Sequence, residues 1–150
     1  MEVESRRGPR ERPVSARTFI DSNILIYTYD DGAPAKRDRS RALVHGLMES
    51  GTGVISTQVM QEFVAVASRK LGLPPLTAKA ALRIWASLDT VQITPDLVHA
   101  AIDEMVLHRL SFWDSLIVAA AASAHCAELL TEDLHHGQTI RGVTVRNPFA

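Results

Sequence analysis

Two acidic residues of the sequence directly follow predicted strands. Asp21 comes after the short β-like run 17–20, and Asp133 comes after the strand predicted over 128–131. In parallel sheets, ligand and catalytic sites form at the carboxyl ends of strands. The two carboxylates are therefore expected at one edge of a sheet, although each could also simply start or cap a turn.

Two further acids lie on predicted helices. At about 100° per residue, Asp114 points the same way as Ile117 in the helix 112–125, which is apolar all round and should be buried. Glu62 lies at the edge of the apolar arc of the helix that ends at Leu71. Taken singly, Asp114 could be a first-turn acid favoured by the helix dipole, and Glu62 could be a solvated boundary residue.

Taken together, the four acids indicate a different chemistry. Carboxylates that converge on one site repel each other, so they need protonation or a divalent cation. Oxygen ligands without a useful set of cysteines or histidines favour Mg²⁺ or Mn²⁺ over zinc. Such a site suits hydrolysis of a phosphodiester, because one metal ion activates water and the same or a second ion stabilises the leaving oxygen.

The elements that must position these acids alternate along the chain. Strands are predicted over 17–20, 51–56, 91–93, 128–131 and 142–145, and helices over 24–29, 35–49, 57–71, 77–88, 95–108 and 112–125. Short strands alternating with helices predict an α/β fold with a mostly parallel sheet that is covered on both faces.

The composition restricts the class of protein. The chain has 150 residues, of which 46% are hydrophobic, and this predicts one domain with its own core. The single cysteine, Cys126, excludes an internal disulfide and fits a reducing compartment. The longest apolar run, 116–122, is far below the roughly 20 residues of a membrane span. A cytoplasmic protein with no membrane partner is expected.

The charge is unevenly distributed. The net charge of −1 gives no overall basic field for nucleic acid, but residues 1–17 hold five arginines against three glutamates. That segment carries +2 and the remainder carries −3. Residues 1–16 are predicted to be a disordered basic tail, which could hold RNA phosphates or be a solvated extension, and 17–150 are predicted to be the folded domain.

Four short segments resemble those of a known family. In order along the chain, 19–25, 61–63, 113–117 and 130–134 resemble the motifs of PIN-domain ribonucleases, and the pattern over 17–149 is similar to that of VapC toxins from bacterial type II toxin–antitoxin pairs. The resemblance implies a three-layer α/β/α sandwich around a mostly parallel sheet. It also implies RNA cleavage dependent on Mg²⁺ or Mn²⁺, a homodimer, and a VapB-like antitoxin encoded beside the gene.

The same resemblance implies roles for individual residues. Asp21, Glu62, Asp114 and Asp133 would be the catalytic, metal-binding acids, and Asn23 and Thr131 would orient the carboxylates. Asp21 and Asp114 are expected as direct ligands, whereas Glu62 reaches the metal ion through water or acts on the attacking water. Glu132, His135 and His136 offer substitutes for Asp133.

Other functions stay open at this point. A PIN nuclease of RNA processing outside a toxin–antitoxin pair fits the same residues, and so does a non-catalytic module that binds protein or RNA. A phosphotransfer protein with Asp21 as acceptor fits poorly, because Asn23 stands where a phosphatase needs a second aspartate and the last lysine is Lys79.

Several other side chains have two interpretations. The basic strip 36–41 could bind phosphate or be a solvated helix face, and Trp85 and Trp113 could stack on bases. Trp113 is better explained as a core or dimer-surface residue, and His135 and His136 as residues of an exposed turn.

Overall fold

A computed structural model describes residues 16–150, so the predicted disordered tail lies outside the described residues except for Ala16. The strands in this part are β1 (Thr18–Ile20), β2 (Gly53–Ser56), β3 (Asp89–Val91), β4 (Glu128–Leu130), β5 (Thr139–Ile140) and β6 (Val143–Arg146). The helices are α2 (Ser22–Tyr27), α3 (Pro34–Ser50), α4 (Thr57–Leu71), α5 (Pro75–Ile84), α6 (Pro95–His108) and α7 (Phe112–Ser123), with a 3-10 turn η1 (Trp85–Ser87) after α5.

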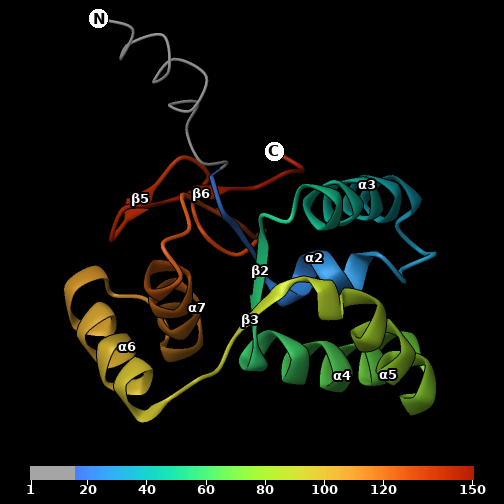
Figure 1. Cartoon of the computed structure of the whole chain (residues 1–150), viewed down its shortest axis with the longest axis horizontal. Coiled ribbons are helices and arrows are strands. Elements are labelled where there is room, and N and C mark those ends of the chain that lie inside the picture. The colour runs from blue at the N-terminus through green and yellow to red at the C-terminus, as the bar shows by residue number, and fades with distance from the viewer. Residues whose placement is uncertain (1–15) are drawn as a thin grey trace, which may run out of the picture.

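The strands form one sheet between two layers of helices. The strand order is β3-β2-β1-β4-β6-β5, and every neighbouring pair is parallel except β5 and β6. Helices α2 to α5 lie on one side of the sheet, and α6 and α7 lie on the other (Figure 1). This arrangement confirms the predicted α/β/α sandwich with a mostly parallel sheet, and it follows from right-handed crossovers between parallel strands.

The chain reverses its direction of travel across the sheet next to β1. It passes from β1 outward through β2 to β3, and then crosses to β4 on the other side of β1. The hydrogen-bond ladder between β1 and β4 continues to their carboxyl ends, where the backbone N–H of Asp21 donates to the carbonyl of Leu130 at 3.0 Å. The carboxyl ends of β1 and β4 therefore form the switch point at which ligands bind in sheets of this kind.

The core is built from the central strands and the helices against them. Phe19, Ile20, Leu129 and Leu130 are completely buried, and every residue of α7 from Ser115 to Ala121 is buried between the sheet and α6. The prediction of a buried apolar helix is thus confirmed. Within residues 16–150, no single helix is long and apolar enough to cross a membrane; α6 and α7 meet that test only as a pair bent by 114°.

Several element boundaries differ from the predicted ones. The predicted strand 91–93 lies two residues earlier, and the predicted helix 77–88 begins at Pro75, because proline suits the first helical turn, and ends at Ile84. Strand β5 was not predicted. It pairs with β6 through a two-residue turn in which Arg141 and Gly142 both have positive φ, of 52° and 81°.

An ion pair between a buried glutamate and an exposed arginine connects α6 to this turn. Glu104 on α6 is 2% exposed, and Arg141 donates to one of its carboxylate oxygens at 2.9 Å. His108 Nε2 lies 3.3 Å from the other oxygen. Because a buried charge without a partner is costly, these contacts hold α6 and the β5–β6 hairpin together.

Gly53 at the start of β2 has no room for a side chain. A Cβ there would lie 2.6 Å from Leu88 Cδ2 and 3.0 Å from Leu47 Cβ. We expect Gly53→Ala to lower the free energy of unfolding by about 1–3 kcal/mol through overpacking, as measured by chemical denaturation. The matched control is Gly46→Ala on α3, where nothing lies within 4 Å and a gain of about 0.5–1 kcal/mol is expected. Equal effects of the two substitutions would contradict this interpretation.

Candidate active site at the carboxyl edge of the sheet

The Asp21 carboxylate lies buried at the switch point. Asp21 is the N-cap of α2, and its Oδ1 accepts a hydrogen bond from the backbone N–H of Ser22 at 2.7 Å. Its Oδ2 accepts from the hydroxyl of Thr131 at 2.8 Å, and the residue is only 4% exposed. Because the carboxylate is bound to the ends of both β1 and β4, its position is fixed by the sheet itself.

Thr131 connects three parts of the site. Its hydroxyl group donates to Asp21 and accepts from Asn23 Nδ2 at 3.3 Å and from the backbone N–H of Asp133 at 3.1 Å. The single hydroxyl proton and both lone pairs are therefore used. Of the two predicted orienting residues, Thr131 thus contacts the Asp21 carboxylate directly, and Asn23 contacts Thr131.

Glu62, in the second turn of α4, is held by two residues that the sequence analysis did not identify. Ser22 donates its hydroxyl proton to Glu62 Oε1 at 3.0 Å, and Gln58 Nε2 lies 3.3 Å from Oε2. The buried Gln58 amide also donates to the carbonyl of Trp113 at 3.2 Å, and so connects α4 to the start of α7. The spacing of four residues between Gln58 and Glu62 was the available signal, because it places both on one helix face.

Asp114 lies half-buried in the first turn of α7. The hydroxyl of Ser111, the N-cap of α7, accepts from the backbone N–H of Asp114 at 3.1 Å. Next to it, Trp113 is 61% exposed, so it is not a core residue. Helix α7 begins at the carboxyl edge of the sheet, which brings Asp114 to the same side of the molecule as the end of β1.

The two consecutive acids after Thr131 face different surroundings. Asp133 is exposed at the site. Glu132 instead accepts hydrogen bonds from Tyr27 Oη, at 2.6 Å, and from Lys36 Nζ. Lys36 lowers the pKa of Glu132 against the effect of burial, so Glu132 is already paired with a cation. It is therefore a poor substitute for Asp133.

His136 and most cations of the basic strip 36–41 have partners within the fold. His135 and His136 are exposed, as predicted, and His136 Nδ1 accepts from the backbone N–H of residue 147 at 3.0 Å. In the strip, Arg37 pairs with Asp31 and Asp38, and Arg41 donates to the carbonyl of residue 28. Lys36, Arg37 and Arg41 are thus used within the fold, whereas Arg39 is exposed and forms no ion pair within residues 16–150.

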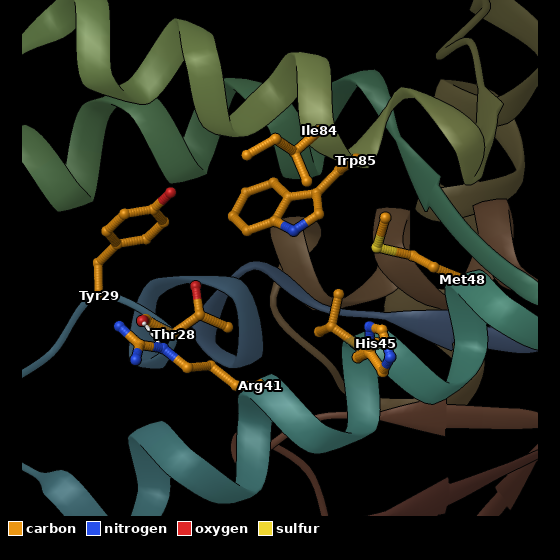
Figure 2. A pocket seen from close by; sticks show the side chains of 8 residues that line it. Thr28, Tyr29, Arg41, His45, Met48, Ile84 and Trp85 are labelled. Atoms are coloured by element: carbon orange, nitrogen blue, oxygen red, sulfur yellow. Dashed lines mark hydrogen bonds between the residues drawn. The ribbon is translucent and has the colours of Figure 1, made fainter.

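All four predicted acids line one cleft of about 230 Å³. The remaining lining residues are Ser22, Val66, Trp113 and Ile117. A separate cavity of about 330 Å³, lined by residues of α3 and by Tyr29 and Trp85, contains none of the four acids. Figure 2 shows Tyr29 and Trp85 on its walls with Arg41 and His45 from α3. Trp85 is 5% exposed and packs on Phe63, so it is a core residue.

The family of the chain is shown by comparison with protein-family models. Residues 18–139 match the model of the PIN domain. The chain belongs to the PIN-domain family. A search of curated proteins gave no significant match.

Solved structures with the same fold include toxin–antitoxin proteins. VapC20 of Mycobacterium tuberculosis, described as a toxin that cleaves the sarcin-ricin loop, has 21% identity and a TM-score of 0.62 over 77% of this chain and 91% of its own. A toxin–antitoxin complex from Klebsiella pneumoniae gives 20% identity and a TM-score of 0.65 over 87% and 97%. VapBC2 of Rickettsia felis, bound to a promoter DNA fragment, gives 17% and 0.63 over 87% and 97%.

The cleft of this PIN domain concentrates negative charge. Burial raises the pKa of Asp21 to about 7, against the hydrogen bonds from Thr131 and Ser22, and the charges of Asp133 and Glu62 raise it further. Burial also raises the pKa of Asp114, again with contributions from Asp133 and Glu62. Among the described residues, no lysine, arginine or histidine forms an ion pair with any of these four acids.

The donor set of the PIN domain fits a hydrated divalent cation. PIN domains generally use such ions. In residues 16–150, no three histidine, cysteine, aspartate or glutamate side chains lie close enough to form a ready-made metal cluster. Mg²⁺, however, is usually held by only one or two carboxylates and keeps several waters. Four carboxylates around an open cleft, without a cationic side chain paired to them, match that mode of binding.

The raised pKa of Asp21 predicts how stability changes with pH in the metal-free PIN domain. The folded state holds this proton up to about pH 7, whereas an exposed aspartate loses it near 3.8. The free energy of unfolding should therefore fall as the pH rises through this window, by up to about 4 kcal/mol for this group. Asp21→Asn, which does not titrate, should become more stable than the wild type by a margin that grows with pH. Urea denaturation in chelator at pH 5 and pH 8 measures this margin, and a margin independent of pH would refute the assignment.

Proposed function

We propose that this PIN domain is a metal-dependent endoribonuclease that hydrolyses RNA phosphodiester bonds and acts as the toxin of a type II toxin–antitoxin pair. The observation that carries the proposal is the convergence of Asp21, Glu62, Asp114 and Asp133 on one cleft. If these acids served only to stabilise the fold, a lysine or arginine would be expected among them. The fold instead pairs a cation with Glu132, beside the cleft.

In this mechanism each acid has a separate task. Asp21 and Asp114 would hold Mg²⁺ or Mn²⁺ directly, and the exposed Asp133 would bind it through a coordinated water. The bound ion supplies positive charge for the phosphate and its leaving oxygen. Thr131, itself held by Asn23, keeps the Asp21 carboxylate in one orientation.

Glu62 is placed to act on the attacking water. Ser22 and Gln58 hold its two carboxylate oxygens at the edge of the cleft. A carboxylate in this position can accept the proton of the water as its oxygen attacks phosphorus, and the leaving oxygen departs on the opposite side. No side chain is needed as a covalent nucleophile.

The toxin role rests on the fold shared with toxin–antitoxin proteins. The similar structures from Klebsiella pneumoniae and Rickettsia felis are complexes of this kind. The proposed partners are an RNA substrate, a VapB-like antitoxin and a second copy of the chain, all in the cytoplasm. Exposed apolar side chains on α6, Val106 at 75% and Leu107 at 71%, offer surface for protein partners.

Substitution of the two proposed direct ligands tests the site. Asp21→Asn and Asp114→Asn should each lower the rate of RNA cleavage by about 100-fold or more, because several kcal/mol of transition-state stabilisation is lost with the metal ion. Asp103→Asn, an exposed acid on α6, is the matched control and should cleave at the wild-type rate. Wild-type cleavage by either cleft variant would show that the site is assigned wrongly.

Metal removal tests the cofactor separately. Chelation with EDTA should abolish cleavage, and Mg²⁺ or Mn²⁺ in excess should restore it, because the four carboxylates repel each other and the phosphate without a cation. The assay is gel electrophoresis of a labelled RNA across a metal titration. Full activity in chelator would exclude the metal mechanism.

The toxin role has its own test. Expression of the wild-type chain should arrest growth, Asp21→Asn should not, and co-expression of a small neighbouring gene should relieve the arrest. RNA cleavage in vitro without growth arrest, and without such a neighbour, would favour a PIN nuclease of RNA processing. Absence of both cleavage and metal binding would favour a non-catalytic binding module.

A further inference from the structure

A second cleft, of about 300 Å³, adjoins the one that holds the four acids. The two share Ser22, Val66 and Asp133, so they form a continuous groove. The second cleft extends along α4 to Lys70 and Leu71 at the end of that helix. None of the roles proposed above uses this extension.

One stripe of α4 runs along the groove. Glu62, Val66 and Lys70 are spaced by four residues, so they lie on the same helix face. Eight residues at about 1.5 Å each place Lys70 about 12 Å from Glu62 along the helix axis. Lys70 does not line the cleft of the four acids, so it would meet a different group of the same ligand.

The second cleft is lined by charged residues of both signs. Lys70 is exposed and makes no ion pair within residues 16–150, whereas the lining residue Glu132 is paired with Lys36. Asp133 lies at the junction with the first cleft. The end of the groove at Lys70 is therefore the part that can accept an anion.

The wall of the second cleft also suits the base and ribose of a nucleotide. Ile26, Val66 and Leu71 give it an apolar surface. Asp30 uses Oδ1 to accept the backbone N–H of Gly32 at 3.0 Å, so Oδ2 remains as an acceptor for a ribose hydroxyl or a base N–H group. Lys70 is the one cationic residue in the lining of the second cleft, so it is the residue there that can bind phosphate.

We infer that the second cleft is a nucleotide subsite: it holds the nucleotide next to the scissile phosphate, and Lys70 binds the backbone phosphate that follows. The inference rests on the proposed ribonuclease function and extends it to one side of the cut. Lys70 contacts a phosphate of the RNA backbone, so it contributes to affinity for RNA of any sequence.

Lys70 variants of the full chain test the subsite. Lys70→Ala should raise KM for a single-stranded RNA about 3- to 10-fold, Lys70→Glu should raise it further, and Lys70→Arg should restore most of the affinity. The slope of log KM against log salt concentration should fall by about 0.7 in Lys70→Ala, the value for one lost phosphate contact on a single strand. Arg69→Ala is the matched control, because Arg69 precedes Lys70 on α4 but does not line either cleft.

Substrate length provides a second readout. On an RNA shortened so that no phosphate reaches Lys70, the difference in KM between Lys70→Ala and the wild type should become smaller. Shortening the RNA on the other side of the cut should leave that difference unchanged. The subsite would be refuted if Lys70→Ala and Arg69→Ala changed KM equally, or if Lys70→Ala lowered only kcat. It would also be refuted if the difference in KM between Lys70→Ala and the wild type persisted on the shortened RNA. A wild-type protein that cleaves no RNA with Mg²⁺ or Mn²⁺ would instead refute the ribonuclease function itself.

Discussion

The burial of one carboxylate organises the edge of the sheet. Asp21 lies between the ends of β1 and β4, where it is 4% exposed and its side chain is costly to ionise. The hydroxyl of Thr131 and the backbone N–H of Ser22 offset only part of that cost, so the pKa of Asp21 is still raised to about 7. The site is therefore built around a group that becomes fully charged at neutral pH only when a positive charge arrives. Glu62 and Asp114 are positioned around this group by side-chain contacts between helices.

Those contacts connect elements that the backbone alone does not hold together. Helices α4 and α7 lie on opposite faces of the sheet, and both begin at its carboxyl edge (Figure 1). Gln58 bridges them by donating to the carbonyl of Trp113, and Ser22 joins α2 to Glu62. The relative positions of the acids thus depend on two uncharged polar residues that need carry out no chemistry themselves.

The sequence was sufficient for the features that local patterns encode. The parallel sheet, the strand-end positions of Asp21 and Asp133 and the buried helix α7 were all predictable, because periodicity acts within a few residues. The bridging role of Ser22, 40 residues from Glu62, and the pairing of Lys36 with Glu132, 96 residues away, were not. Such contacts leave no trace in spacing, so the sequence could not tell which of two adjacent acids faces the cleft. Strand β5 was missed because two residues carry no periodicity.

The edges of the sheet limit how the molecule can associate. At one edge β5 is two residues long and antiparallel, and the ion pair between Arg141 and Glu104 holds its turn against α6. At the other edge β3 has three residues, and its exposed Asp89 pairs with Arg17. Short edge strands present few free backbone groups to a strand from another chain. The sheet is thus protected against edge-to-edge aggregation, which leaves the helical faces as the larger surfaces for association.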